Sequence, residues 1–301
     1  MICTSFEDIR NRCKASAGMK RMAIAAANDN DSIEAAIEAR AAGIAEPVLI
    51  GEKASIINIL TALGETIPEQ DIFDEPDSTK ACEIAVSFIR KGRADFLMKG
   101  KVDTGALLKA VVNKEAGLGK GRLMSHFTIF EVPSYHKLLT VVDGGMVAYP
   151  NLEQKKDIIA NTVDTLMALG YTRPKVGILA CVEKVNPKMP ETIEADELAK
   201  LNASGEIANC IINGPISYDC AISSEIAAHK GYGGEVAGDV DILVAPNIHA
   251  GNIMGKMLTC TCYAKLAGII VGAKCPIVLT SRTSTAEEKL YSIMLSAVVS
   301  D

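Results

Sequence analysis

Tryptophan is absent from the sequence, and aromatic residues of any kind make up only 4% of its 301 residues. Acidic residues outnumber basic ones, 37 to 31, for a formal net charge of −6, and no basic stripe stands out. Proteins that bind nucleic acid need clustered Lys and Arg to neutralise phosphates. We therefore exclude nucleic acid as a partner, and we expect an anionic substrate to be held by a few local cations and helix N-termini.

Long apolar runs are missing too. None reaches the ~18–20 residues of a membrane-spanning helix, and the first eight residues show no basic segment followed by an apolar one. We therefore expect neither a signal peptide nor a membrane span, and a cytoplasmic location. With 49% hydrophobic and 23% charged residues the chain is typical of a globular protein, and its length favours two domains.

The nine cysteines contain no CxxC pair, and Cys260 and Cys262 fall within an expected helix, where their side chains diverge. No group of carboxylates has metal-ligand spacing either. We expect free, buried thiols in a reducing compartment, and no metal site.

Short apolar segments alternate with helical patterns along almost the whole chain. This alternation predicts mainly parallel strands covered by helices on both faces. The expected strands are Arg21–Ala27, Pro47–Ile50, Ala94–Met98, Phe127–Val132, Leu138–Val142, Lys175–Ala180, Ala208–Ile212, Val240–Val244 and Pro276–Thr280. The expected helices include Thr104–Val112, Asp219–His229, Gly251–Leu266 and Thr285–Val298.

One short loop, residues 133–137, interrupts the alternation. It is too brief for a helix, so the strands on either side of it are predicted to form an antiparallel hairpin. We expect a second α/β domain to begin there, and the last strand and helix to return to the first. The predicted fold is therefore two three-layer α/β domains with mainly parallel sheets and a cleft between them. The predicted domains are residues 1–125 with 275–301, and residues 126–274.

The last strand-to-helix junction combines several reactive side chains. Ser281 and Arg282 follow the last strand, and Ser284 with Glu287 has the spacing of a capping box. Parallel α/β sheets bind ligands at such junctions, and an Arg fork fits two phosphate oxygens. Arg282 is either such a ligand or half of a surface ion pair. Glu288 is either a general base or an acid that complements the helix dipole.

A second junction contains Lys99, Gly100, Lys101 and Thr104, which form a glycine turn before a helix. The free amides and the lysines suit a phosphate. The alternative is a solvated turn in which Thr104 is the N-cap.

A third junction contains Asn247 after a strand, then Gly251 and Asn252 where a helix opens. The two amide side chains suit a phosphate or an acyl oxygen as hydrogen-bond donors. The alternative for Asn252 is a simple helix N-cap.

Four ordered motifs resemble the phosphate acetyl/butyryltransferase family, and most closely its butyryltransferase branch. They are residues 94–111, 214–219, 238–252, and 279–282 with 286–291, and the resemblance runs essentially from end to end. It implies two α/β domains with the site in the cleft between them, and a homodimer or larger homo-oligomer. It also implies transfer of a short acyl group between coenzyme A and inorganic phosphate, both substrates, with no cofactor bound permanently.

Ser281 and Arg282 match the Ser-Arg pair of the acetyltransferase branch, and Glu288 stands where that branch has an Asp, six residues after the Arg. The resemblance implies that Arg282 neutralises the phosphate, that Ser281 hydrogen-bonds the phosphate or the oxyanion, and that Glu288 is the catalytic base. The residues expected to hold phosphate and coenzyme A are Lys99, Gly100, Lys101, Thr104, Asn247, Gly251 and Asn252.

Three other interpretations stay open. The first is the same chemistry on an acetyl or a branched-chain acyl group, because pocket size is not readable from the sequence. The second is a metal- and nicotinamide-dependent hydroxyacid dehydrogenase of similar architecture, which needs an Asp cluster that the sequence lacks. The third is a non-catalytic scaffold or ligand sensor of the same fold.

Overall fold

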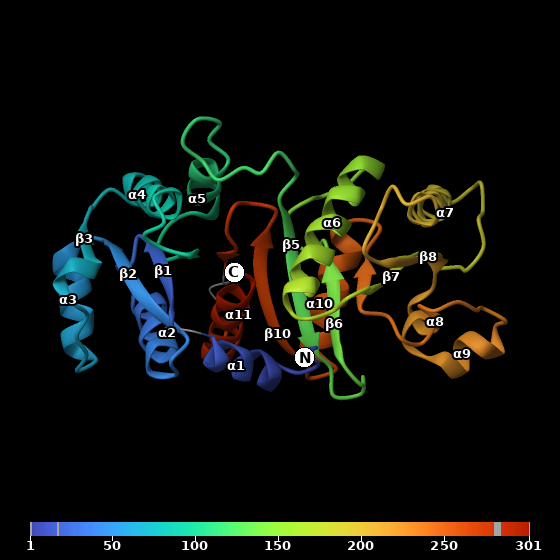
Figure 1. Cartoon of the computed structure of the whole chain (residues 1–301), viewed down its shortest axis with the longest axis horizontal. Coiled ribbons are helices and arrows are strands. Elements are labelled where there is room, and N and C mark those ends of the chain that lie inside the picture. Colours follow the sequence, from blue (N-terminus) through green and yellow to red (C-terminus); the bar gives the residue numbers. More distant parts are fainter. Residues whose placement is uncertain (1, 17, 280–283, 301) are drawn as a thin grey trace. The chain divides into compact units, whose positions relative to one another are not determined.

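The computed structural model describes residues 2–16, 18–279 and 284–300 (Figure 1). The chain divides into two compact units. The first unit comprises Glu7–Arg122 and Ala267–Asp301, and the second comprises Met1–Phe6 and Leu123–Leu266. The domain limits predicted above, and the cleft between the domains, stay predictions.

The first unit contains a sheet with the strand order β3-β2-β1-β4-β11-β10. The pairings from β3 to β11 are parallel, and β11 pairs with β10 antiparallel. The last strand thus returns to the sheet of the N-terminal half, as predicted. The strands are β1 (Lys20–Ala25), β2 (Ala45–Gly51), β3 (Ile72–Asp74), β4 (Phe96–Lys99), β10 (Lys265–Val271) and β11 (Ile277–Val278). The helices are α1 (Phe6–Ala15), α2 (Asn30–Ala41), α3 (Lys53–Ala62), the 3-10 helix η1 (Glu69–Asp71), α4 (Ser78–Arg90), α5 (Thr104–Val111) and α11 (Ala286–Val299).

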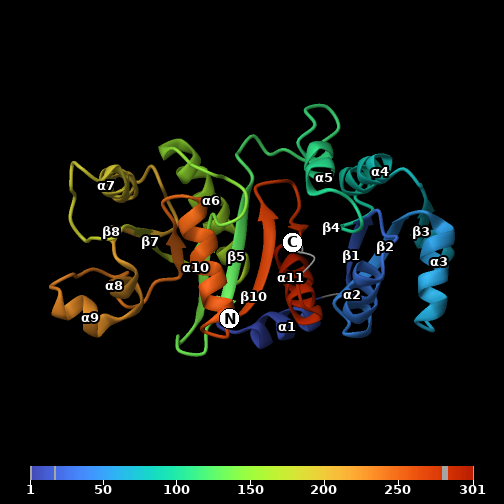
Figure 2. The same cartoon turned by 180° about the vertical axis from the view of Figure 1, so that it is seen from behind.

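The second unit contains strands in the order β5-β6-β9-β7-β8. The predicted hairpin is confirmed, because β5 and β6 pair antiparallel, and the remaining neighbours are parallel. The strands are β5 (Ser125–Glu131), β6 (Leu138–Val142), β7 (Lys175–Leu179), β8 (Ile211–Ile216) and β9 (Ile242–Val244). The helices are α6 (Leu152–Ala168), α7 (Pro190–Ala203), α8 (Tyr218–Ile222), α9 (Ser224–His229) and α10 (Ile248–Cys260). Helix α6 lies in front of this sheet in Figure 1 and α10 in front of it in Figure 2, so the two helices cover opposite faces.

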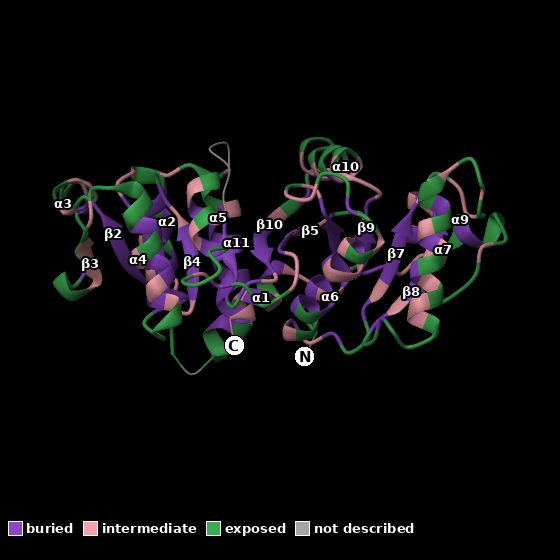
Figure 3. Ribbon diagram, turned by 90° about the horizontal axis from the view of Figure 1, so that it is seen from above, coloured by how far each residue is buried: buried purple, intermediate pink, exposed green. Residues whose placement is uncertain are grey.

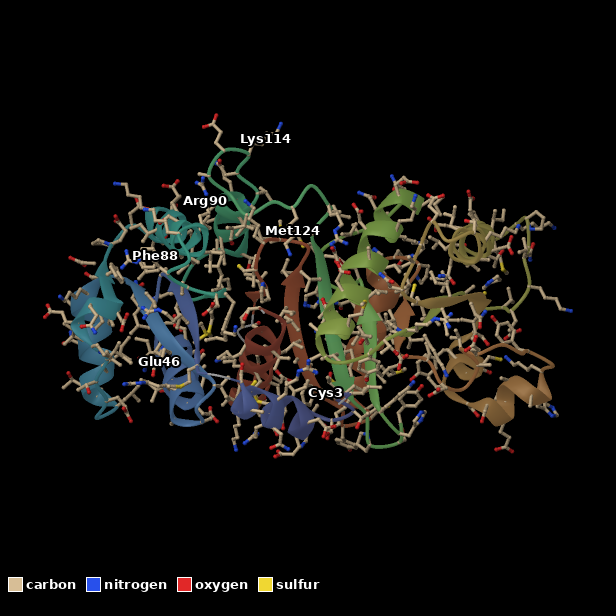
Figure 4. All side chains as sticks on the ribbon, in the orientation of Figure 1. Cys3, Glu46, Phe88, Arg90, Lys114 and Met124 are labelled. Carbon is tan, nitrogen blue, oxygen red and sulfur yellow. The ribbon has the colours of Figure 1, made fainter. Side chains whose placement is uncertain are left out.

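The core of each unit lies along its strands, which are mostly buried between helices that expose only their outer sides (Figure 3). In β1 the residues from Met22 to Ala25 are fully buried, which explains why the sequence shows apolar runs without alternation. At the outer edge of the first sheet, Phe73 of β3 and Phe88 of α4 (labelled in Figure 4) pack edge to face, with their ring centroids 4.7 Å apart. The predicted mixed α/β fold is confirmed.

Two helix predictions are wrong, and each has a local cause. The helix predicted over Gly251–Leu266 ends at Cys260, because Tyr263 adopts a left-handed backbone (φ 54°) and the following apolar residues form β10. The helix predicted over Asp219–His229 is divided at Ser223, whose backbone is extended and whose hydroxyl caps α9 by accepting a hydrogen bond from the Ile226 amide.

The nine cysteines all lie in the described part of the chain, and all are free thiols. Six are buried as predicted, whereas Cys181 and Cys260 are exposed and Cys262 is half-buried. None of the helices in the described part of the chain is long and apolar enough to cross a membrane.

Candidate functional site

The first unit contains a polar pocket of about 390 Å³ at the carboxyl end of β4, which we call the lysine pocket. Parallel sheets bind ligands at this end of their strands. Three of the residues predicted to bind phosphate or coenzyme A line it together. Its lining includes Lys99, Gly100, Lys101, Lys289, Asp29 and Asp31.

The turn that forms this pocket requires glycine at position 100. A Cβ there would lie 2.3 Å from the carbonyl oxygen of Ala26, because the turn packs directly against the end of β1. Lys99 holds the same turn, since its ammonium donates to the carbonyl oxygens of Gly100 at 3.0 Å and Val102 at 3.2 Å. Lys101, by contrast, is exposed.

The helix after this turn is capped by Asp103. Its carboxylate accepts a hydrogen bond from the Gly105 amide at 2.8 Å, while Thr104 is the first, exposed residue of α5. The interpretation of Thr104 as the N-cap is therefore wrong. An Asp in the β region satisfies the first-turn amides equally well, and the cap lies one residue earlier than predicted.

The start of α11 is also capped one residue away from the prediction. The capping box joins Thr285 and Glu288: the Glu288 amide donates to the Thr285 hydroxyl, and the Thr285 amide donates to the Glu288 carboxylate, both at 3.1 Å. The predicted box of Ser284 and Glu287 is wrong, and the Glu287 carboxylate accepts from the Tyr291 hydroxyl. Glu288 thus has a structural role. Ser281 and Arg282 lie outside the described residues.

Lys289 was not identified from the sequence. It lies in the first turn of α11, it is 8% exposed, and its side chain lines the lysine pocket. Its ammonium lies 3.6 Å from the carboxylate of Asp31 on α2. The only sequence signal was a basic residue in a first turn, where acidic residues are preferred.

In the second unit, α10 begins at the predicted third junction. Asn247 is the N-cap, and its side-chain oxygen accepts from the Ala250 amide at 3.1 Å. Gly251 lies so close to the loop after β6 that a Cβ would meet the Asp143 carbonyl oxygen at 2.6 Å. Asn252 is not the cap, because it is already inside the helix, and its side chain donates to the Gly144 carbonyl at 3.0 Å. These three residues fix α10 against the end of β6.

A second pocket, also of about 390 Å³, lies beside α10 and at the ends of β7 and β9; we call it the apolar pocket. Its walls are mainly hydrocarbon and sulfur, from Leu179, Cys181, Met189, Pro246, Ala250 and Met254. The sequence did not identify it, although Pro246 directly precedes the predicted residue Asn247. These residues come from segments that only the fold brings together.

Tyr218, the first residue of α8, also lines the apolar pocket. A phenol is neutral at neutral pH and can donate a hydrogen bond, and burial raises the pKa of this one further above the usual value. Among the described residues the structure shows no hydrogen-bond partner for this hydroxyl.

A cluster of possible metal ligands includes the two residues after Tyr218 and one from the loop after β7. Ligand atoms of Glu183, Asp219 and Cys220 lie within 4.8 Å of one another. The ammonium of Lys230 already neutralises the carboxylates, at 2.9 Å from both Glu183 and Asp219. Hydrogen bonds from Ser217 and Lys230 lower the pKa of Asp219 to about 2, as expected for a carboxylate beside an ammonium. These contacts make the cluster an ion-pair network.

The chain is similar to known proteins along most of its length. The family described as phosphate acetyl/butaryl transferase matches residues 75–297. The chain is 42% identical to phosphate butyryltransferase of Clostridium acetobutylicum over 98% of both chains. It is 43% identical to phosphate acetyltransferase of Thermotoga maritima over 93% of this chain and 95% of that protein. Among solved structures, a branched-chain phosphotransacylase from Enterococcus faecalis superposes with a TM-score of 0.82 and 29% identity, covering 94% of this chain and 99% of that one.

Proposed function

Because the chain belongs to the phosphate acetyl/butaryl transferase family, we propose that it moves a short acyl group between coenzyme A and inorganic phosphate. The preferred reaction is butyryl-CoA plus phosphate giving butyryl phosphate plus coenzyme A. Similarity to a phosphate butyryltransferase along 98% of both chains supports this reaction. The predicted family is confirmed.

The apolar pocket is the observation that carries the acyl part of this proposal. A four-carbon chain needs a dry wall of hydrocarbon and sulfur, and Met189, Ala250 and Met254 provide one. We propose that Tyr218, which lines the same pocket, donates from its hydroxyl to a carbonyl oxygen. An acyl thioester has this combination of an apolar tail and a carbonyl.

The lysine pocket supports the anionic part. We propose that Lys99, Gly100, Lys101 and Thr104 hold phosphate, with Lys99 acting mainly by fixing the turn. Lys101 contributes an exposed cation, and the first turn of α5 contributes backbone amides. Asn247, Gly251 and Asn252 are proposed to act in the second unit by positioning α10 beside the apolar pocket.

In this proposal a phosphate oxygen attacks the thioester carbon, a C–O bond forms, the C–S bond breaks, and coenzyme A leaves as a thiolate that takes up a proton. Arg282 neutralises the attacking phosphate and Ser281 donates to it or to the oxyanion, a contribution worth ~3–4 kcal/mol per well-placed donor. Glu288, whose carboxylate also accepts from the Thr285 amide, serves as the base in the reverse direction.

Further parts of the proposal follow from the family. Coenzyme A and phosphate are substrates, and the enzyme needs no permanently bound cofactor. It acts in the cytoplasm as a homodimer or larger homo-oligomer, and its six buried free thiols suit a reducing compartment.

The test is release of coenzyme A thiol from a series of acyl-CoA substrates of two to five carbons, straight and branched, with and without phosphate. We expect phosphate-dependent release that is fastest with butyryl-CoA. If none of the substrates releases thiol in a phosphate-dependent way, the proposal is refuted.

A second candidate is a preference for acetyl-CoA, which the 43% identity to a phosphate acetyltransferase favours. The same series of substrates separates the two candidates, since one methylene changes specificity by ~1–3 kcal/mol.

A further inference from the structure

The position of Lys289 in its helix is electrostatically unfavourable. It lies in the first turn of α11, where the helix dipole is positive and repels a cation. It is also only 8% exposed, so most of its side chain is shielded from bulk water. A lysine that is buried and opposes the helix electrostatics indicates a function that compensates for this cost.

The compensation seen within the protein is weak. The Lys289 ammonium lies 3.6 Å from a carboxylate oxygen of Asp31, which is longer than a hydrogen bond. The Asp31 side chain is 68% exposed, so water screens the attraction. In the described part of the chain the structure shows no second acceptor for this ammonium. Helix α11 packs beside α2, which carries Asp31 (Figure 1).

The other charged groups of the lysine pocket are largely engaged. Lys99 donates to two carbonyl oxygens. Asp29 accepts from the amide and the hydroxyl of Ser32, and Asp103 accepts from the Gly105 amide, so both acids act as caps of α2 and α5. Lys289 and Lys101 are therefore the cations of this pocket that retain the capacity to bind an incoming anion.

We propose that Lys289 is a further substrate-binding residue, whose ammonium turns from Asp31 to a phosphoryl oxygen that enters the lysine pocket. The ligand class is a phosphate anion, either inorganic phosphate or a phosphate group of coenzyme A. This inference rests on the proposed function and deepens it. Asp31 acts as the counter-ion that the ligand displaces, so it lowers the affinity for the anion.

The main test compares Lys289→Met and Lys289→Arg, with Lys53→Met as a control that removes a lysine paired with Glu69 elsewhere in the first unit. Loss of a hydrogen bond to a charged group predicts that Lys289→Met raises the KM for the bound anion about tenfold to hundredfold. Lys289→Arg should restore most of the affinity, and the control should match the unsubstituted protein.

A second readout does not need activity. Phosphate that binds the folded protein raises its Tm by mass action. We expect Lys289→Met to keep its Tm in buffer without phosphate, and to lose most of the rise that phosphate produces in the unsubstituted protein. If acyl transfer fails in every assay but this difference in Tm is found, the proposed function falls and the anion site stands.

Two further comparisons complete the test. A raised KM for phosphate assigns Lys289 to inorganic phosphate, whereas a raised KM for coenzyme A but not for dephospho-coenzyme A assigns it to the 3′-phosphate.

Asp31→Asn keeps the inference testable if Lys289→Met does not fold, and it should lower the KM for the anion several-fold. KM values within twofold of the unsubstituted protein for both substrates, with an unchanged response of Tm to phosphate, would overturn the inference.

Discussion

The lysine pocket and the apolar pocket have the same volume, about 390 Å³ each, and both lie at the carboxyl ends of parallel strands in their own unit. Their linings are opposite in chemistry. Three lysines and three aspartates line the first, and methionine, cysteine and leucine side chains dominate the second. The fold therefore supplies the position of each pocket, and the side chains decide which half of an acyl-CoA and phosphate pair it suits.

The largest expected effect is on the anionic side of this comparison. Arg282→Ala should reduce the kcat for butyryl-CoA and phosphate by about a hundredfold to a thousandfold, because a donor to the developing charge is lost. The Tm should stay unchanged. Steady-state kinetics and thermal unfolding measure the two quantities, and turnover near that of the unsubstituted protein would remove Arg282 from the mechanism.

A second substitution damages the lysine pocket alone. Gly100→Ala places a Cβ 2.3 Å from the Ala26 carbonyl oxygen, so the turn must move and the KM for phosphate should rise at least about tenfold. Gly119→Ala is the matched control, since a Cβ there meets nothing within 4 Å. If the two variants have equal phosphate KM values, the turn at Gly100 does not belong to the phosphate site.

The matching substitution in the apolar pocket is Ala250→Leu, which fills part of the space beside Met254. We expect the ratio of kcat/KM for butyryl-CoA to that for acetyl-CoA to fall about tenfold or more, because one methylene is worth about that much in a tight pocket. Ala203→Leu, at an exposed site on α7, is the control. An equal loss with all chain lengths would show that the pocket holds another part of coenzyme A.

Glu288→Gln separates the two roles of this residue. Glutamine preserves the capping box, because its side-chain oxygen still accepts from the Thr285 amide. If Glu288 is the base, the acidic limb of the pH–rate profile should disappear and kcat should fall about a hundredfold. A variant with an unchanged profile would restrict Glu288 to holding the start of α11.

The smallest expected effect concerns the network beside Tyr218. The pKa of Asp219 is lowered to about 2, so its ion pair stabilises the fold above the ordinary pKa of about 3.9, and this stabilisation is lost as the pH falls toward about 2. Asp219 is 42% exposed, which keeps the effect small. The Tm should therefore fall less between about pH 5 and 2 in Asp219→Asn than in the unsubstituted protein. Parallel curves would contradict this assignment.

Much of the fold could be predicted because its signals are local. Uniformly apolar strands predicted the covered parallel sheets, and the short loop at residues 133–137 predicted the β5–β6 hairpin. The strand β10 could not be predicted, because the left-handed backbone of Tyr263 that ends the preceding helix has no clear sequence signal. Its apolar residues continue the helical pattern without a break.

The candidate site shows a similar limit. Ser284 and Thr285 are each followed three residues later by a glutamate, so the sequence offered two capping boxes of equal quality, and only the structure selects Thr285 with Glu288. Lys289, Tyr218 and Met254 acquire their roles from contacts between distant segments. Spacing along the chain carries no information on such contacts.

The central claim is that an acyl group passes from sulfur to phosphate. The most direct measurement incubates the purified protein with butyryl-CoA and phosphate, and follows butyryl phosphate by phosphorus NMR alongside the release of coenzyme A thiol. We predict one acyl phosphate for each thiol released. Thiol release without acyl phosphate would identify hydrolysis of the thioester and contradict the account.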